Sequence, residues 1–281
     1  MPRTTLEING LTVHSEGVGP VLVFVHGWPD GPEVWCKTVP ALKHRFRCVL
    51  VTLPGFDLAK PPRPVSVTDI CELLAEVVDH VSPKQSVTLV LHDWGCFFGY
   101  EYAARHRHRV ASVVGVDIGD TNSSAYLQQL SLREKLLISG YQLWLAVAWK
   151  LGPLWPSMAT RMTRFMAKAV GCRTPAETIG WQMNYPYAMQ WLGTKGGLRG
   201  VARVNKLLGA ELPTLFIYGK QKPFMFHSTQ WITHLAKTPG SASHGLEAGH
   251  WLMRQRPEAF NVLLVDWLSR GDAIDQENSC S

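Results

Sequence analysis

The sequence predicts an α/β protein with a mostly parallel central sheet, helices on its flanks and an inserted helical cap. Short apolar runs typical of buried strands alternate with helix-like segments along most of the chain, and parallel strands need such crossover helices between them. The run at residues 87–92 ends in one carboxylate, Asp93, directly before a helical pattern. Residues 121–205 then lose the strand pattern, which resumes after them. These three observations predict the fold class.

Length and composition are consistent with one large domain that carries an insertion. The 281 residues are 46% hydrophobic and 18% charged, which is ordinary for a globular protein. The formal net charge is +6, but the basic residues are scattered and are not interleaved with aromatic ones, so we expect no nucleic-acid partner. The six cysteines form no C-x-x-C pair and no ligand spacing with histidine. This pattern predicts free thiols in a reducing compartment and no metal site.

The ends and the most apolar stretch of the chain bear on its localisation. Residues 1–5 begin no apolar segment of the kind that a secretory signal contains. Residues 136–155 are rich in apolar side chains but are interrupted by Ser, Gly, Gln, Lys and Pro, so they are too broken for a membrane span. We therefore expect a cytoplasmic protein with no membrane span, no cofactor, and a small apolar substrate as its partner.

The first part of the chain is expected to build the sheet. Residues 67–81 have apolar positions at helical spacing, and Ser66 or Thr68 is the candidate N-cap. Residues 54–57 are expected to form a turn, and residues 96–106 the helix after Asp93. The remaining elements predicted here are a helix at 32–42 and strands at 6–14, 21–25, 47–53, 87–92 and 110–117.

Residues 121–205 are predicted to form the cap, so that residues 1–120 and 206–281 form the core. The segment is helical in pattern and rich in Trp, Tyr and Met. Most of its aromatic residues are expected to pack cap helices, and a few to line an apolar pocket. Ligands bind at the carboxyl edge of such sheets, so the cap should lie over that edge. The core then resumes with a strand at 213–218, a loop at 244–250, a helix at 257–268 and a polar tail at 271–281.

Asp93 is the residue on which the functional prediction depends. A strand that turns sharply into a helix presents its turn residue at the sheet edge, where the helix N-terminus directs N–H groups toward a ligand. An aspartate there is either a helix N-cap, which is the commoner case, or a nucleophile. Two other segments favour the nucleophile. His26-Gly27-Trp28-Pro29 follows a buried strand, and Gly249-His250-Trp251 puts a histidine on a late loop.

In this order, His-Gly-Trp-Pro, His-Asp-Trp-Gly and Gly-His-Trp resemble the motifs of the Asp-nucleophile branch of the α/β-hydrolase superfamily. They are similar to those of epoxide hydrolases first and haloalkane dehalogenases second. The resemblance implies a hydrolase in which ionised Asp93 attacks a saturated carbon, most simply opening an epoxide to a diol. His250 would then activate the water that hydrolyses the ester on Asp93. The backbone N–H groups of Trp28 and Trp94 would form the oxyanion hole.

The resemblance also implies groups that bind the substrate and protonate the opened ring. In epoxide hydrolases two cap tyrosines protonate the emerging alkoxide, and we assign this role to Tyr141 and Tyr185. The residues assigned to substrate binding are His26, Trp28, Trp94 and Tyr187. Haloalkane dehalogenases instead hold the halide between the Trp after the nucleophile and an Asn or second Trp near the oxyanion loop. Trp94 matches the first of these positions, and Trp28 stands where the Asn would be.

The sequence departs from the family pattern at the triad acid. Related enzymes carry an aspartate three residues past the glycine that ends the late strand, and here Lys222 follows Gly219 at that distance. A lysine cannot accept the hydrogen bond of the histidine Nδ1–H. Some dehalogenases supply the acid from the preceding strand end, which is Asp117 here, with Asp120 second, although Asp117 could equally be a turn or cap residue. The alternatives are therefore an epoxide hydrolase with a relocated acid, a haloalkane or haloacetate dehalogenase, and a catalytically impaired binding protein of the same fold.

Overall fold

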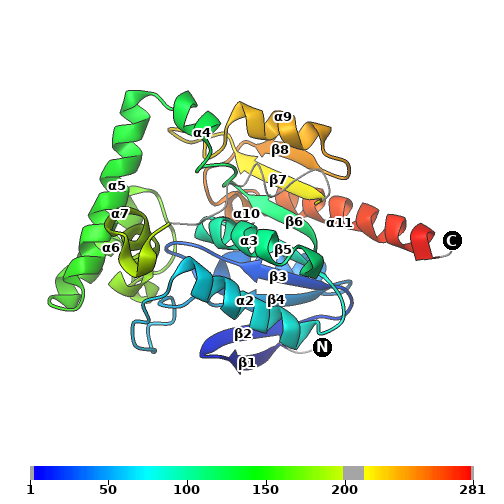
Figure 1. Cartoon of the computed structure of the whole chain (residues 1–281), viewed down its shortest axis with the longest axis horizontal. Coiled ribbons are helices and arrows are strands. Elements are labelled where there is room, and N and C mark those ends of the chain that lie inside the picture. Colours follow the sequence, from blue (N-terminus) through cyan, green and yellow to red (C-terminus); the bar gives the residue numbers. More distant parts are fainter. Residues whose placement is uncertain (1–2, 199–211, 280–281) are drawn as a thin grey trace.

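The computed structural model describes residues 3–198 and 212–279, and an eight-stranded sheet lies at its centre (Figure 1). The strand order is β1-β2-β4-β3-β5-β6-β7-β8. Only β1 and β2 run antiparallel to their neighbours. The predicted fold class is confirmed. The strands are β1 (Thr4–Ile8), β2 (Leu11–Glu16), β3 (Val21–Val25), β4 (Arg47–Val51), β5 (Val87–His92), β6 (Val110–Val116), β7 (Thr214–Gly219) and β8 (Ala242–Leu246).

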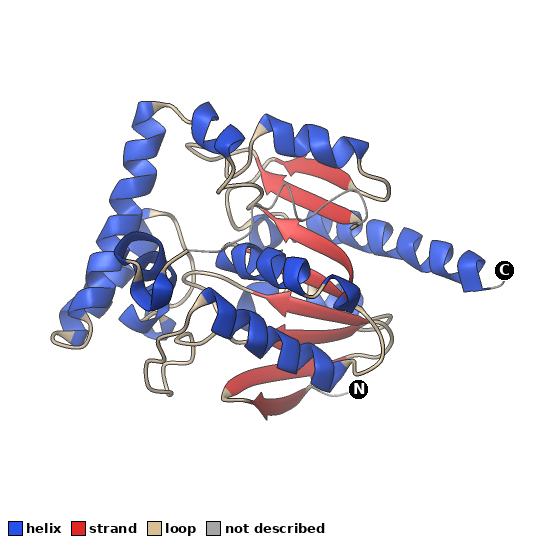
Figure 2. Cartoon of the chain, viewed as in Figure 1, coloured by secondary structure: helices blue, strands red, loops and turns tan. Residues whose placement is uncertain are grey.

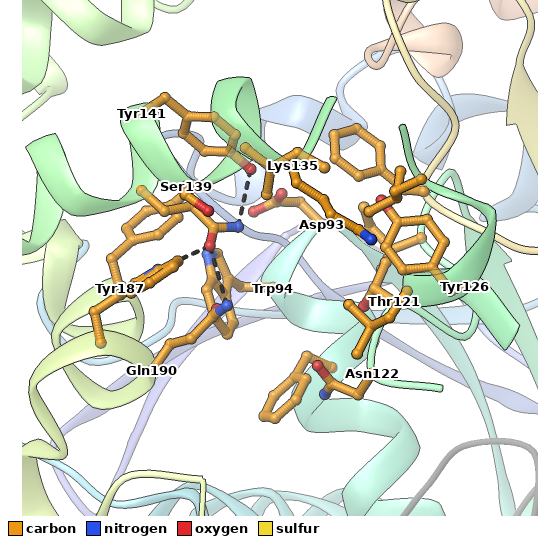
Figure 3. Close-up of a pocket in the computed structure, with 18 residues that line it drawn as sticks. Asp93, Trp94, Thr121, Asn122, Tyr126, Lys135, Ser139, Tyr141, Tyr187 and Gln190 are labelled. Carbon is orange, nitrogen blue, oxygen red and sulfur yellow. Dashed lines mark hydrogen bonds between the residues drawn. The ribbon is translucent and has the colours of Figure 1, made fainter. Parts of the chain in front are cut away.

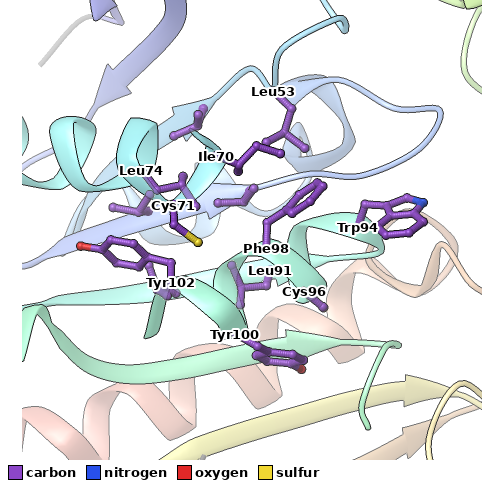
Figure 4. Close-up of a cluster of buried hydrophobic side chains, with 14 of the residues drawn as sticks. Leu53, Ile70, Cys71, Leu74, Leu91, Trp94, Cys96, Phe98, Tyr100 and Tyr102 are labelled. Atoms are coloured by element: carbon purple, nitrogen blue, oxygen red, sulfur yellow. The ribbon is translucent and has the colours of Figure 1, made fainter. Parts of the chain in front are cut away.

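Helices cover both faces of the sheet, and each face has its own apolar core (Figure 2). Successive side chains of a strand point to opposite faces, so in β3 Val23 and Val25 join one core while Leu22 and Phe24 join the other. The first core packs under α2 (Val67–Val81), α3 (Trp94–Arg105) and α9 (Thr229–Lys237), and part of it is drawn in Figure 4. The second packs under α1 (Val39–Leu42), α10 (Leu252–Gln255) and α11 (Pro257–Ser279).

The start of α2 confirms one of the two predicted caps. The Ser66 hydroxyl accepts from the Asp69 N–H at 3.0 Å, and the Asp69 carboxylate accepts from the Ser66 N–H at 2.7 Å. This reciprocal pair satisfies two N–H groups that the first helical turn leaves without partners. The Thr68 hydroxyl instead accepts from Arg105 of α3 at 2.9 Å, so it ties two helices together.

Two predicted elements in the first part of the chain are each divided in two. Residues 6–14 were expected to form one strand, but Asn9 (φ 45°) and Gly10 (φ 78°) turn the chain between β1 and β2. An Asn-Gly pair readily takes the positive φ values of a tight hairpin turn. Residues 32–42 form η1 (Pro32–Trp35) and then α1 rather than one helix. Pro40 has no N–H to donate to a preceding turn, so a helix can contain it only near its start.

The C-terminal part differs from prediction at two places. Residues 244–250 were expected to be a loop, but β8 extends to Leu246. Its Ser-His-Gly sequence has no strand signal, and its pairing with β7 imposes the conformation. The closing helix was expected to end at residue 268 and a polar tail to follow, but α11 continues to Ser279. One glycine, Gly271, costs a helix only about 1 kcal/mol, and Ala, Gln and Glu follow it.

The inserted segment contains helices and no strand among its described residues. The helices are α4 (Ser124–Gln129), α5 (Leu132–Leu151), α6 (Pro156–Ala169) and α7 (Tyr185–Leu192), and the 3-10 turns η3 (Ala176–Thr178) and η4 (Trp181–Asn184) lie between α6 and α7. Helices α5, α6 and α7 lie beyond the carboxyl ends of the parallel strands, on the left in Figure 1. Of the predicted cap limits, 121 and 205, the second falls outside the described residues. The cap therefore stands over the sheet edge at which Asp93 ends β5.

Candidate active site

Asp93 occupies a strained turn between β5 and α3. Its backbone lies at φ 54° and ψ −125°, a region that residues with a side chain rarely enter. In the described part of the chain its carboxylate makes no capping hydrogen bond to α3. Oδ1 instead accepts from the Trp28 N–H at 2.6 Å, and the N–H of the next residue, Trp94, helps to lower the pKa of the carboxyl. The geometry is that of a partly buried turn residue whose carboxylate is held by a backbone donor at the edge of the cavity, as the nucleophile hypothesis requires.

Two glycines make this close approach possible. A Cβ at Gly27 would collide with the Asp93 carboxylate and the Trp94 nitrogen. A Cβ at Gly95 would collide with the carbonyl oxygens of Val25 and His26. The loop after β3 can therefore lie directly against the first turn of α3 only because both positions lack a side chain.

His250 joins Asp93 to Asp117. Its Nε2 lies 3.5 Å from Asp93 Oδ2, and its Nδ1 donates to Asp117 Oδ2 at 2.7 Å. Asp117 follows β6, is fully buried, and has φ 70°. The contact that a relocated acid would have to make is thus present, between segments 133 residues apart.

Lys222 is also part of this arrangement. Its side chain is only 5% exposed and forms an ion pair with Asp117 Oδ1, which also accepts from the Gly219 N–H at 2.9 Å. The ammonium lies 5.1 Å from the centre of the Phe226 ring. The place where related enzymes carry the acid is therefore filled by a cation that turns back onto the relocated carboxylate.

Asp120, the second candidate acid, has a structural role. Its carboxylate accepts from the Ser123 hydroxyl at 2.6 Å and from the Ser228 N–H and hydroxyl at 2.7 and 2.6 Å. Ser123 and Ser228 are the N-caps of α4 and α9. Asp120 therefore fixes the start of two helices, and Asp117 is the carboxylate that reaches His250.

The structure brings two tyrosines to the cavity around Asp93, but not the predicted pair. Tyr141 and Tyr187 line this cavity and lie on one side of Asp93 (Figure 3). Tyr185 packs instead against Phe56, Phe98 and Trp149, and its hydroxyl has no hydrogen-bond partner among the described residues. The structure therefore places Tyr187 rather than Tyr185 beside Asp93, because residues two apart on a helix point to nearly opposite sides.

Each cavity tyrosine contacts a side chain that carries an N–H group. The Gln142 amide donates to the Tyr141 oxygen at 3.2 Å, and its own oxygen accepts from Gln190 and Trp191 at 3.0 and 2.9 Å. Tyr187 packs edge to face on the Trp94 indole, with 5.3 Å between the ring centres. Because an amide N–H can only donate, the Tyr141 phenol keeps its own proton free to donate. Burial raises the pKa of Tyr141 and of Tyr187, so both stay protonated at neutral pH.

His26 was expected to bind substrate, and the structure contradicts this. Its ring is fully buried, packs on Phe56, and accepts from the Leu53 N–H at 3.1 Å through Nε2. Burial lowers the pKa of His26 to about 4, so the ring is neutral. His26 therefore braces the loop that carries Trp28, below the cavity rather than on its wall.

Two buried polar residues that the sequence did not single out also position the site. Asp30 accepts from the Trp251 indole at 2.6 Å and from the Thr174 hydroxyl, so it ties the Trp28 loop to the His250 loop and the cap. His92 donates from Nε2 to the His250 carbonyl at 3.2 Å. In the sequence, the one feature that could have pointed to them is their position beside predicted site residues. Asp30 lies two residues after Trp28, and His92 directly precedes Asp93.

The cavity has two lobes that share Asp93, Tyr141, Tyr187 and Phe226. One lobe, of about 320 Å³, runs beneath α4 and α5 and has a mixed lining. Thr121, Asn122 and Tyr126 lie on its far side from Tyr141 (Figure 3). The other lobe, of about 530 Å³, holds His250 and Lys222. Its apolar lining is Leu137, Met166, Ala169, Val170, Phe224 and Phe226. Among the described residues, no group of three or more potential ligands is arranged to hold a metal ion.

The family to which this chain belongs follows from a direct match. The model of the alpha/beta hydrolase fold family matches residues 20–257. The chain belongs to the α/β-hydrolase fold family. The resemblance to epoxide hydrolases and haloalkane dehalogenases is confirmed at the same time, because similar curated proteins carry both names.

Three curated relatives of this α/β hydrolase cover different shares of it. A cis-3-alkyl-4-alkyloxetan-2-one decarboxylase from Shewanella oneidensis is 25% identical, over 89% of this chain and 83% of its own. Bifunctional epoxide hydrolase 2 from Sus scrofa is 23% identical over 93% of this chain, which spans 54% of the porcine protein. A haloalkane dehalogenase from Mycolicibacterium smegmatis is 32% identical over 40% of this chain and 38% of its own.

A solved structure agrees with this assignment at the level of the fold. An epoxide hydrolase mutant from Bacillus megaterium, in complex with its product (R)-3-[1]naphthyloxy-propane-1,2-diol, superposes with a TM-score of 0.71. The match covers 95% of this chain and all of the other at 20% identity. At this identity the likeness shows the shared fold alone.

The ionised groups of the α/β-hydrolase site stabilise one another, because carboxylates and cations alternate in it. Burial opposes ionisation of Asp93, but hydrogen bonding to His250 and its charge keep the pKa of Asp93 below its ordinary value. Burial also opposes ionisation of Asp117, but the charge of Lys222 and the hydrogen bond with His250 lower the pKa of Asp117 to about 2. Burial would lower the pKa of His250, but its bonds to Asp117 and Asp93 raise it to about 9. The free site thus holds an imidazolium between two carboxylates.

This arrangement predicts a pH-dependent stability. A group whose pKa is raised on folding stabilises the native state fully below its unfolded pKa, near 6.5, and loses that contribution as pH rises through its folded pKa, near 9. Relative to His250→Gln, the native protein should therefore lose on the order of 3 kcal/mol of unfolding free energy between about pH 6 and pH 10. Urea denaturation of both proteins across this range measures it. Parallel curves for the two proteins would contradict the assigned imidazolium.

Proposed function

We propose that this hydrolase opens epoxides to diols through a covalent ester on Asp93. The observation that carries the proposal is the pair Tyr141 and Tyr187 on the cavity wall beside Asp93. The Tyr141 oxygen accepts a bond from Gln142 and so leaves its proton for an oxygen of the substrate, and burial keeps both phenols protonated. A strained ring bound there would have its oxygen against two donors and its carbon toward a carboxylate.

The first step uses the two carboxylate oxygens of Asp93 differently. Oδ1 is held by the Trp28 N–H at 2.6 Å, whereas Oδ2 faces His250 and the cavity. Oδ2 would attack a ring carbon, forming a C–O bond as the ring C–O bond breaks. The electron pair of the broken bond goes to the ring oxygen, which takes a proton from Tyr141 or Tyr187. Because Asp93 is already ionised, this step needs no base.

The second step returns Asp93 to its ionised form. With Asp93 esterified, its negative charge no longer raises the pKa of His250, and the imidazolium proton can return, directly or through water, to the phenolate that the first step leaves. Neutral His250 then takes a proton from a water that attacks the Asp93 carbonyl carbon. Negative charge develops on Oδ1, which the Trp28 N–H already contacts, and the N–H of the adjacent Trp94 is the second donor proposed for it. The intermediate then collapses: the bond between the carbonyl carbon and Oδ2 breaks, Oδ2 leaves with the diol and takes the second proton of the attacking water, and Asp93 is again a carboxylate. Asp117 holds the Nδ1–H and stabilises the imidazolium that forms.

The contacts in the site argue against a dehalogenase and against a catalytically impaired binding protein. Halide binding would need free indole N–H groups, but Trp28 donates to the Asn184 side chain at 2.9 Å. A catalytically impaired binding protein would not need the hydrogen-bonded series from Asp93 through His250 to Asp117. Epoxide opening uses each of these groups.

A second candidate comes from the Shewanella relative, which is named as a decarboxylase of alkyl-substituted oxetan-2-ones. Such a four-membered lactone is also strained and carries a ring oxygen for the tyrosines, and the apolar lobe of about 530 Å³ suits alkyl chains. Oδ2 of Asp93 would attack C4 and displace the carboxylate. Loss of CO₂ from C3 would then form the C3–C4 double bond and expel Asp93. That reaction consumes no water, so its product is an alkene rather than a diol.

Substitution of the tyrosines tests the proposal. We expect Tyr141→Phe and Tyr187→Phe each to slow ester formation by about 10²-fold or more, because a general acid contributes roughly that much. Tyr185→Phe is the matched control and should leave the rate unchanged, since its hydroxyl lies in the packed interior. Single-turnover kinetics with styrene oxide, read by mass spectrometry of the Asp93 peptide, measure the step.

Product analysis separates the candidates. The native protein is incubated with styrene oxide, a chloroalkane and a cis-dialkyl oxetan-2-one, and diol, chloride and alkene are quantified. Diol as the dominant product supports the proposal, and alkene with CO₂ supports the second candidate. Chloride release in preference to diol, or an equal effect of all three tyrosine substitutions, would rule the proposal out.

A further inference from the structure

The exposed apolar side chains of this protein gather on the cap. In the described part of the chain, all large apolar side chains that are exposed lie between residues 127 and 192, except Val18 and Val262. Globular proteins rarely expose a large contiguous apolar area unless it contacts a partner or a membrane. Helix α5 forms the outer edge of the molecule, on the side of the cap away from the sheet (Figure 2). The exposed apolar side chains of the cap therefore indicate a surface that contacts a partner or a membrane.

On α5 these side chains form one stripe. Leu132, Leu136, Leu143 and Val147 are exposed, and their spacing of 4, 7 and 4 residues keeps them on one side of a helix. The opposite side of α5 carries Leu145 and Ala148, which are fully buried in the cap, and Ala146 is buried as well. The stripe is thus a second apolar face that the helix presents to its surroundings.

Helix α6 continues this apolar surface. Phe165, which is 62% exposed, contacts Trp144 of α5 with 5.8 Å between the ring centres. Met158 lies two turns before Phe165 on the same side of α6 and is also exposed. At the turn between the two helices, Leu154 is 71% and Trp155 is 57% exposed. An apolar surface with an exposed indole at its tip is typical of helices that lie in a membrane interface.

The positive charge of the protein lies on the same part of the chain. Residues 121–198 contain eight Lys or Arg and only two Asp or Glu, an excess of six that equals the net charge of the whole chain. Lys150 on α5 and Arg161 and Lys168 on α6 are exposed. Lys150 continues the stripe of Leu143 and Val147, and Arg161 and Lys168 lie within one turn of Phe165. Basic side chains therefore border the apolar surface.

We propose that this surface, the α5–α6 face, docks on the headgroup region of an anionic lipid bilayer. The α5–α6 face consists of Leu132, Leu136, Leu143, Trp144, Val147, Leu154, Trp155, Met158 and Phe165, bordered by Lys150, Arg161 and Lys168. The apolar side chains would enter the boundary of headgroups and acyl chains while the basic ones contact lipid phosphates. None of the described helices combines the length and apolar content needed to cross a bilayer, so α5 and α6 would lie along the membrane plane.

Charge favours a bilayer over a second copy of the chain. In a two-fold contact the same surface meets itself, so the basic border would face a basic border, and like charges across an interface oppose association. An anionic bilayer has the complementary sign. The cavity lies close by, since Leu137 of α5 and Met166 and Val170 line its apolar lobe. If the substrate is apolar, as the proposed function implies, docking would bring the cavity near the phase in which that substrate dissolves.

Vesicle binding of the whole protein tests the proposal without any substrate. The native protein should co-sediment with phosphatidylcholine–phosphatidylglycerol vesicles and much less with pure phosphatidylcholine, and added salt should weaken the binding. The triple variant Lys150→Gln/Arg161→Gln/Lys168→Gln should bind roughly 100-fold more weakly, at about fivefold per charge. Leu154→Ser/Trp155→Ser should weaken binding about tenfold or more. All five positions lie outside the cavity lining.

Matched variants on the core are the controls. Lys37→Gln/Lys84→Gln/Lys237→Gln removes three exposed charges, and Val18→Ser/Val262→Ser removes two exposed apolar side chains; neither should change vesicle binding. Absence of binding to anionic vesicles, equal binding to neutral ones, or equal effects of cap and core variants would overturn the proposal. A dimer in sedimentation velocity that Leu154→Ser/Trp155→Ser dissociates, without vesicle binding, would show instead a contact between copies. These outcomes do not depend on the reaction at Asp93, so failure here leaves the proposed function standing.

Discussion

We expect Asp93→Ala to abolish ester formation and His250→Gln to form the ester once and then stall. Without the Asp93 carboxylate no group in the cavity stands in its place between the Trp28 N–H and His250. Without His250 the carboxylate can still attack, but no base activates the water, and hydrolysis should slow by about 10³–10⁴-fold. Quenched mass spectrometry after mixing with an epoxide should show a stable adduct on the Asp93 peptide of His250→Gln alone.

The isotope pattern gives a second readout of the same scheme. If water attacks the Asp93 carbonyl carbon, a single turnover in ¹⁸O-water puts the label into Asp93 rather than into the diol. His44→Gln, on an exposed position of the core, is the control and should behave like the native protein. Equal loss of the adduct in the Asp93 and His250 variants, or label only in the diol of the first turnover, would contradict a covalent two-step reaction.

The second large effect is expected at Asp117 and Lys222. Asp117→Asn should slow ester hydrolysis by about 10³–10⁴-fold while leaving ester formation nearly intact, because it removes the acceptor that holds the His250 Nδ1–H. Lys222→Met removes the cation that pairs with Asp117. The carboxylate then acts on His250 alone, so the pKa of His250 should rise further and the pH midpoint of hydrolysis should move upward. Rapid-quench kinetics from about pH 6 to pH 10 measure both changes.

The ion pair also decides what Lys222→Asp should do. A vacant acid position would gain activity from this substitution, but the position is filled, and Lys222→Asp would put a second carboxylate against a fully buried one. We therefore expect a loss of about 3–5 kcal/mol in unfolding free energy, as when a buried ion pair is broken. Lys220→Met, which removes an exposed lysine two residues away, is the control for Lys222→Met. A pH midpoint that does not move in Lys222→Met, or a stable and more active Lys222→Asp, would show that the pair does not tune His250.

The sequence by itself predicted the fold class and the residues to which the proposed reaction is assigned. Asp93, the oxyanion loop and His250 each lie in a few consecutive residues at the end of a strand or on a late loop. The residues next to them along the chain, such as Gly27, Trp94 and Gly249, complete the short motifs by which they were recognised. A strand-to-helix turn is built from local backbone geometry, so it can be recognised without knowing the rest of the molecule. The position of Asp117 directly after the strand β6 was predictable from the local sequence as well.

Only the tertiary structure decided which distant side chains meet. Tyr185 and Tyr187 have similar surroundings in the sequence, and the docking of α7 on the core turns one into the packed interior and the other into the cavity. In the sequence, Lys222 occupies the usual position of the triad acid. The structure shows that it forms an ion pair with Asp117, because the ends of β6 and β7 lie side by side. His26 was predicted to bind substrate, but the turn after β4 packs against its ring and buries it. Each outcome depends on how elements far apart in the chain pack together, and local sequence patterns do not contain that information.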